Sequence, residues 1–211
     1  MADRFFGEVD QIGPAARSVA KRAIDVLVSG LLLAIVSPVL LIIALSVLLS
    51  SRGPVIFRQN RGGLKAKPFA VMKFRTMYVV EDGDHVRSAV RGDRRVTPVG
   101  SFLRATSLDE LPQLVNVLLG DMSLVGPRPH ALVHDEVYGD ALDSYCRRFA
   151  VRPGITGLAQ VRGLRGEIRT LDCIKSRLSA DCEYIEGWTL KSDVSILLRT
   201  LPLLVRDHNA Y

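Results

Sequence analysis

Two adjacent carboxylates, Asp109 and Glu110, lie in the run Thr106-Ser107-Leu108-Asp109-Glu110-Leu111-Pro112-Gln113. Ser107 followed three residues later by Glu110 is the pattern of a capping box, and Pro112 fits only the first turn of a helix. We therefore predict a helix over 107–119 that carries both carboxylates at its start, capped by Ser107 or by Asp109 itself. Such a helix end favours ionised carboxylates and offers free N–H groups to a phosphate. Alone, the pair is more typical of an acidic start that only stabilises its own helix.

Basic side chains near this pair in the sequence could bind phosphate oxygens, because a guanidinium fork matches them. Lys73 and Arg75 lie two residues apart in a predicted strand, so we expect both on one face. Arg104 precedes the carboxylates, and Arg128 sits in a rigid Gly-Pro-Arg-Pro turn. Each arginine could equally form a surface ion pair. Two carboxylates with several such cations suit phosphate chemistry that uses a metal ion.

An apolar segment from Ile24 to Leu49 has Asp25 as its sole charge. As one straight helix it would be roughly 39 Å long, enough to cross a hydrocarbon core of about 30 Å. Ser37-Pro38 lies near its midpoint, where proline kinks or breaks a helix. Basic residues flank both ends, Arg17, Lys21 and Arg22 before it and Arg52, Arg58 and Arg61 after it. Neither end resembles an outside end. The segment is either a re-entrant helix or a kinked spanning helix, and these features leave both open.

The composition limits the classes of partner that this protein could bind. The net charge of +6 fits an anionic membrane surface, a nucleotide, a lipid phosphate or nucleic acid. Only 6% of residues are aromatic and no basic patch is interleaved with aromatic residues, so we predict no nucleic-acid partner. The three cysteines have no metal-ligand spacing, and an odd number favours a reducing compartment. Phosphate-loop and dinucleotide-binding glycine motifs are missing from the sequence, which argues against those enzyme classes.

The fold class predicted is α+β, with a membrane helix followed by a small domain of amphipathic helices and a β-hairpin. Pro54–Arg58 and Pro68–Arg75 are the predicted hairpin strands. Helices are predicted at 133–148, 172–186 and 190–206, with an extended stretch at 154–163. The last helix has a leucine-rich stripe that could lie on lipid or in the core. The domains predicted are a lead-in at 1–20, the membrane helix at 21–51, and a catalytic domain at 52–211.

Two smaller patterns also carry predictions. Arg22 and Asp25 are three residues apart and could pair at the membrane interface, which would make the acidic residue less costly there. His130 and His134 are one helical turn apart, a spacing that could hold zinc. No third ligand is specified by the pattern, and we predict a solvated helix start instead.

Several motifs occur in a fixed order, which is more specific than any one of them. Arg104–Gln113, Gly120–Pro129 and Arg152–Gly157, with Lys73-Phe74-Arg75-Thr76-Met77 and Lys21-Arg22 upstream, closely resemble the bacterial sugar transferases, the monotopic phosphoglycosyl transferases. The resemblance covers roughly residues 20 to 206. It implies transfer of a sugar 1-phosphate from a UDP-sugar to polyprenyl (undecaprenyl) phosphate with release of UMP. This would be the first membrane step of exopolysaccharide or glycoconjugate synthesis, at the cytoplasmic face of the bacterial inner membrane.

The same resemblance assigns roles to residues. It implies a re-entrant anchor broken at Ser37-Pro38, Asp109 as the nucleophile that forms an acyl-phosphate, Glu110 as its partner, and Mg²⁺ in the site. Asp181 corresponds to a further functional acidic position. Glu110 could hold the metal or act as a base, and the sequence does not separate these roles. Lys73, Arg75, Arg104 and Arg128 remain the candidate phosphate ligands.

Other hypotheses stay open from the sequence. The lipid phosphate could attack the nucleotide sugar directly, with both carboxylates on the metal. A membrane-anchored interaction module without enzymatic activity, whose Asp109-Glu110 pair is only a cap, is the alternative from another class. The lipid bilayer is a predicted partner in each case, and a homodimer is a possibility. The sugar and the glycan pathway are not determined by these motifs.

Overall fold

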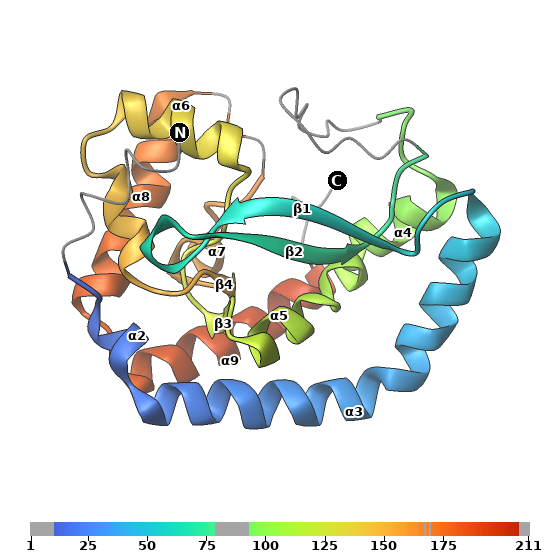
Figure 1. Ribbon diagram of the computed structural model, residues 1–211, viewed down its shortest axis with the longest axis horizontal. Helices are drawn as coiled ribbons and strands as arrows, with labels where there is room; N and C mark the ends of the chain where they lie inside the picture. The colour runs from blue at the N-terminus through green and yellow to red at the C-terminus, as the bar shows by residue number, and fades with distance from the viewer. Residues whose placement is uncertain (1–10, 79–92, 167, 169, 207–211) are drawn as a thin grey trace.

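The structure is a computed structural model that describes residues 11–78, 93–166, 168 and 170–206. The predicted lead-in therefore lies partly outside the described residues. The chain forms a long helix and a mixed helix–strand domain (Figure 1). In order, its elements are α2 (Pro14–Arg17), α3 (Val19–Ser50), β1 (Ile56–Gly62), a 3₁₀ turn (Leu64–Ala66), β2 (Pro68–Phe74), α4 (Pro98–Ala105), a 3₁₀ turn (Leu108–Glu110), α5 (Gln113–Leu119), β3 (Ser123–Val125), α6 (Leu132–Ala141), a 3₁₀ stretch (Tyr145–Ala150), β4 (Gly154–Thr156), α7 (Leu158–Val161), α8 (Leu171–Glu186) and α9 (Leu190–Arg206).

Helix α3 contains the apolar segment and is sharply bent (Figure 1). It spans 32 residues with Pro38 inside it, and proline explains a bend because it removes a backbone donor and clashes with the preceding turn. The Ser37 hydroxyl donates to the Ala34 carbonyl at 2.9 Å. Among the described residues, α3 alone is long and apolar enough to cross a membrane.

The two faces of α3 differ in burial. Its second half packs Ile43 and Val47 against Phe74 of β2 and Leu103 of α4. The opposite face leaves large apolar side chains exposed along the helix, including Leu27, Leu31, Ile35, Leu41, Ile42, Leu45, Leu48 and Leu49. A continuous exposed apolar face of this size is typical of a surface that contacts lipid or protein.

The first half of α3 is joined to the domain by polar contacts. The Lys21 ammonium lies 2.6 Å from Asp193 Oδ2 of α9 and donates to the Val125 carbonyl at 3.2 Å. The Tyr184 hydroxyl and the Trp188 indole N–H also donate to Asp193. Lys21 and Asp193 are both buried, so this is a paired buried charge with further hydrogen bonds.

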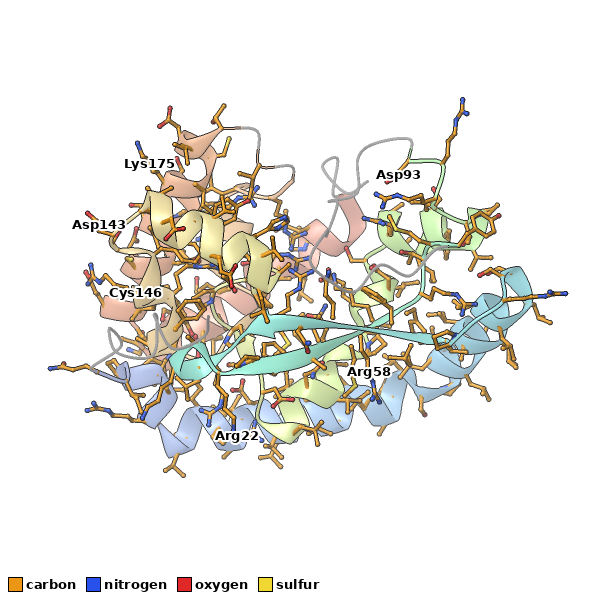
Figure 2. All side chains as sticks on the ribbon, turned by 45° about the horizontal axis from the view of Figure 1, so that its top comes forward. Arg22, Arg58, Asp93, Asp143, Cys146 and Lys175 are labelled. Carbon is orange, nitrogen blue, oxygen red and sulfur yellow. The ribbon has the colours of Figure 1, made fainter. Side chains whose placement is uncertain are left out.

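The predicted Arg22–Asp25 pair is wrong. The Arg22 guanidinium projects from α3 (Figure 2) and donates to the carbonyls of Val117 and Leu118 at the end of α5. Asp25 Oδ1 instead accepts from the Leu124 N–H at 3.1 Å. The physical reason is that the last carbonyls of a helix and a buried carboxylate both need partners, and the domain supplies them.

Over the described residues the domain contains two sheets of two strands each. The β1–β2 hairpin is antiparallel and pairs Ile56 with Phe74 through to Gly62 with Pro68, which confirms the predicted hairpin with a longer first strand. Strands β3 and β4 pair in parallel. This pairing requires glycine at 154, because a Cβ there would lie 2.1 Å from the Gly126 nitrogen.

The helices predicted near the C-terminus are confirmed, whereas the elements predicted in the middle of the chain have other bounds in the structure. Helices α8 and α9 match 172–186 and 190–206. The stripe on α9 divides, because Leu197 packs against the core while Val194 and Leu201 are exposed. The predicted 133–148 helix ends at Ala141, and the extended stretch from 154 ends at Thr156 where α7 follows.

Candidate active site

The carboxylate pair lies in a 3₁₀ turn just before α5, and not at the start of one continuous helix. Ser107 adopts a left-handed φ of 56° and its side chain makes no cap hydrogen bond, so the predicted capping box is wrong. Asp109 does not cap α5 either, because Pro112 occupies that position. A left-handed conformation is unfavourable for serine, so surrounding contacts hold this turn in place.

Glu110 is held by two cations. Its carboxylate accepts from both terminal nitrogens of Arg128, one at 3.0 Å, and its Oε1 lies 2.7 Å from the Lys73 ammonium. Burial opposes ionisation of Glu110, but Arg128 and Lys73 outweigh it and hold its pKa well below the usual range. Glu110 is therefore a fixed anion that orients the two cations.

Asp109 is in a different environment from its neighbour. Only 9% of the residue is exposed. Burial raises the pKa of Asp109 to about 6, with Lys73 opposing and the Glu110 charge adding to the shift. A carboxylate that is poorly solvated yet ionised near neutral pH is a more reactive nucleophile than a well-hydrated one.

Side chains that the sequence did not single out hold Lys73 close to the pair. Asn116 of α5 is fully buried and accepts from the Met72 N–H at 2.9 Å, while its amide donates to the Ala70 carbonyl at 2.9 Å. These bonds fix strand β2, and so Lys73, against the helix that follows the carboxylates. Nothing in the sequence of α5 indicated that Asn116 would hold strand β2 in this way.

Arg75 lies elsewhere. It is buried, and its guanidinium donates to the carbonyls of Val47, Ser51 and Pro54, where α3 ends and β1 approaches. Arg75 directly follows β2, and its contacts differ from those of Lys73, whose ammonium lies 2.7 Å from Glu110 Oε1. Its contacts give Arg75 a structural role at the C-terminal end of α3.

A cavity of about 730 Å³ contains the carboxylate pair. Lys73, Arg104 and Arg128 line it beside Asp109 and Glu110. Its volume is within the range of sites for small molecules. Five of the predicted site residues thus meet at one cavity, and Asp181 of α8 lines it as the sixth.

The same cavity has an apolar wall. Helix α3 contributes Val28, Leu32 and Val36, and helix α9 contributes Leu197, Leu198 and Leu201. Helix α9 was predicted to lie either on lipid or in the core. Neither description fits alone, because α9 lines the cavity and also carries exposed apolar side chains. Charged groups and a hydrocarbon surface therefore meet in one space.

Arg148 is a buried hub that the sequence did not predict. Its Nε lies 2.9 Å from Asp181 Oδ2, and its NH2 group donates to the Arg128 carbonyl. Its NH1 group lies 2.8 Å from His130 Nδ1. The predicted solvated position of His130 is wrong, because only 11% of its side chain is exposed. Arg148 is only four residues from the Arg152-Pro153-Gly154 motif, but its burial depends on tertiary contacts.

Mg²⁺, which the family resemblance implies, can be tested against the donor set. Proteins hold this ion with one or two carboxylates, leaving the rest to substrate phosphates and water. Asp109 and Glu110 supply two carboxylates in one turn, although Glu110 would have to exchange contacts with Arg128 and Lys73. Over the described part of the chain no group of three or more His, Cys, Asp or Glu residues could hold a metal. The pair fits an ion that takes most of its ligands from substrate.

This arrangement places two carboxylates and the cations Lys73, Arg104 and Arg128 beside an apolar surface. The chain belongs to the bacterial sugar transferase family, whose model matches residues 16–207, and this confirms the family predicted from the ordered motifs.

The chain is also similar to individual proteins with named activities. The chain is 53% identical to a UDP-glucose:undecaprenyl-phosphate glucose-1-phosphate transferase of Caulobacter vibrioides, over 94% of this chain and 76% of the relative. It is 52% identical to a protein of the same name from Escherichia coli K12, over 86% of this chain and 39% of the relative. A UDP-N-acetylgalactosamine-undecaprenyl-phosphate N-acetylgalactosaminephosphotransferase of Aeromonas hydrophila is 37% identical over 90% of this chain and 44% of the relative. The chain thus spans about two fifths of the last two.

Proposed function

We propose that this protein transfers a sugar 1-phosphate from a UDP-sugar to polyprenyl phosphate. The observation that carries the proposal is that one cavity joins Asp109 and several cations, Lys73, Arg104 and Arg128 among them, to an apolar wall from α3 and α9. The cations suit the diphosphate of a nucleotide sugar, and the apolar wall suits an isoprenoid chain. The names of its relatives favour UDP-glucose as the donor.

The proposed reaction has two displacements at one phosphorus atom. An Asp109 carboxylate oxygen attacks the phosphorus that bears the sugar, and the bond from that phosphorus to the bridging oxygen breaks as UMP leaves. A phosphate oxygen of the polyprenyl phosphate then attacks the same phosphorus and Asp109 is released. Lys73, Arg104 and Arg128 stabilise charge on the phosphoryl oxygens. Mg²⁺ held by Asp109 and Glu110 with substrate would neutralise part of that charge.

Burial of Asp109 supports the covalent route. A carboxylate with a pKa of about 6 is ionised at neutral pH yet weakly solvated, which favours attack. Glu110 already carries its charge against Arg128 and Lys73, so its proposed role is to orient these cations and, when a metal is bound, to share in holding it.

The proposed membrane placement follows from the bend in α3. A helix that turns at Pro38 can enter the bilayer and return to the same side, with its exposed apolar face in lipid. Basic residues at both ends favour the cytoplasmic face of the bacterial inner membrane for both. The acceptor phosphate would then reach Asp109 from the lipid surface.

A panel of UDP-sugars tests the proposed activity. Purified protein in detergent with Mg²⁺ and polyprenyl phosphate should release UMP most rapidly from UDP-glucose, and release without acceptor should stop at one equivalent per protein. Glucose 1-phosphate should appear on the lipid. Absence of lipid-linked product with every UDP-sugar would refute the proposal.

Cysteine labelling tests the membrane placement. The native Cys146, Cys173 and Cys182 are free, with Cys146 on the side formed by α6 and α8 (Figure 2), so each is first replaced by serine. Gln11→Cys and Asn60→Cys are then exposed positions before and after α3. An impermeant maleimide should label both only in inside-out vesicles. Labelling of the two from opposite sides would establish a spanning helix.

A further inference from the structure

His130 lines the cavity, and its ring is held in a defined orientation. It precedes α6, in a segment fixed to strand β1 by the bridge between Arg61 and Ala131 and by the bond from Arg61 NH1 to the Pro129 carbonyl at 3.0 Å. The ring also stacks on Tyr145 at a centroid separation of 6.2 Å. A side chain fixed on several sides can present one hydrogen-bonding atom in one direction.

The contacts of Nδ1 determine where the ring carries its hydrogen. Arg148 NH1 lies 2.8 Å from Nδ1, and a guanidinium can only donate, so Nδ1 is the acceptor. The Tyr145 hydroxyl, 2.7 Å from the same atom, donates to Asp135 Oδ1 at 2.6 Å. Burial and the Arg148 charge also hold the pKa of His130 well below its usual range. The neutral ring therefore has its N–H at Nε2.

Nε2 is the ring nitrogen that remains for a ligand. Within the part of the chain that the structure describes, the hydrogen bonds of the ring to Arg148 and Tyr145 both use Nδ1, and His130 lines the cavity. Asp181, on the same Arg148 guanidinium, lines it as an acceptor. A donor and an acceptor held by one hub suit a neutral group that both accepts and donates.

A hydroxyl group fits this pair better than a phosphate does. A phosphate at Nε2 would approach the Asp181 carboxylate, whereas a hydroxyl can accept from His130 and donate to Asp181. Lys73, Arg104 and Arg128 line the cavity with Asp109 and can offer charge to a phosphate there. Arg165 and Arg177 also line the cavity, and the Arg148 guanidinium is paired with Asp181. A nucleobase imide has the same pairing of donor and acceptor as a hydroxyl, so the two sources must be distinguished by experiment.

We propose that His130 is a specificity-determining residue whose Nε2–H donates to a hydroxyl of the sugar in the UDP-sugar donor, with Arg148 as the positioning residue that sets its tautomer. This inference rests on the proposed transferase function. It adds a contact that selects among donors by the position of their hydroxyl groups, because a site built to hydrogen-bond a hydroxyl rejects an analogue that lacks it.

The test compares His130→Asn with His130→Gln. Asparagine can replace Nδ1 as the acceptor for Arg148 but does not reach as far as Nε2, whereas the longer glutamine amide does. We expect kcat/KM for UDP-glucose to fall about 10-fold in His130→Asn and to recover partly in His130→Gln. His134→Asn is the matched control, since His134 lies one turn away and outside the cavity lining, and its kcat/KM should equal that of wild type.

Deoxy-UDP-glucose donors identify the source of the hydroxyl and test the proposal in the wild-type protein itself. Wild type should lose about 10-fold in kcat/KM with one deoxy analogue, and His130→Asn should lose nothing further with that analogue. Inhibition by UMP should be unchanged in His130→Asn. Weaker UMP inhibition would assign His130 to the nucleobase and overturn the sugar assignment.

The other possible results of these assays also test the proposal. Unchanged kcat/KM in His130→Asn, or equal losses with every deoxy donor in both proteins, would overturn the proposal. If His130→Asn does not fold, the donor comparison in the wild-type protein still tests the proposal, and equal kcat/KM for UDP-glucose and every deoxy donor would overturn it. Wild-type turnover of UDP-glucose separates these outcomes from failure of the proposed function, which would show as no transfer by any variant.

Discussion

Asp109→Asn should abolish sugar-phosphate transfer while the protein remains folded. The amide lacks the nucleophilic oxygen anion, so we expect transfer to fall at least about 10³-fold and no sugar-phosphate to remain on the protein. Radiolabelled UDP-glucose without acceptor measures the adduct, and UMP release measures turnover. Asp172→Asn, at an exposed aspartate in the first turn of α8, is the matched control and should keep wild-type activity.

The same substitution should stabilise the fold. Burial raises the folded-state pKa of Asp109 from 3.8 to about 6, so ionisation destabilises the folded state increasingly as pH rises from about 4 to 6. At neutral pH the variant should gain up to about 3 kcal/mol, and at pH 4 this gain should disappear. Unfolding curves at both pH values check it. Wild-type turnover by Asp109→Asn would contradict the nucleophile, and an adduct-free wild type with full turnover would favour direct attack by the lipid phosphate.

Lys21→Met should destabilise the protein by about 3–5 kcal/mol, because it leaves Asp193 charged and buried without its cation. The bonds from Tyr184 and Trp188 are neutral and do not replace that charge. Urea unfolding in detergent micelles gives the change in free energy. Since α9 lines the cavity, transfer activity should also become less heat-resistant.

Two further variants test whether the loss of stability in Lys21→Met comes from the Lys21–Asp193 pair. Lys21→Met with Asp193→Asn should recover most of the loss, because no unpaired charge remains. Lys191→Met removes an exposed lysine from the first turn of α9 and should cost less than about 0.5 kcal/mol. A Lys21→Met protein within 1 kcal/mol of wild type would mean that the buried pair contributes little net stability.

Local patterns predicted the parts of this fold that depend on short stretches of sequence. The β1–β2 hairpin, α8 and α9 follow from alternation, helical periodicity and turn residues. The region around Asp109 did not, because Ser107 takes a left-handed conformation that only tertiary contacts can hold. The ordered motifs still identified the family, since they depend on residue identity and not on helix boundaries.

The charged site residues that lie in a motif could be predicted from the sequence. Those whose role depends on burial could not. Lys73, Arg104 and Arg128 reach the cavity as expected, whereas Arg75 is bound to the end of α3 by carbonyl groups that sequence alone cannot place. His130 was predicted to be solvated and Arg148 was not singled out, yet contacts with β1 and α8 bury both side chains. The partners of a buried charge come from distant segments, so local pattern does not reveal them.

The apolar wall from α3 has a consequence for how the acceptor is supplied. Under the proposed placement, Val28, Leu32 and Val36 belong to a helix whose outer face lies in lipid, so the bilayer is continuous with one side of the reaction space. An isoprenoid chain could then diffuse in two dimensions to Asp109 without ever entering water. Its effective concentration would be its mole fraction in the membrane, and the lipids around α3 would act as a cosubstrate pool whose composition regulates the rate.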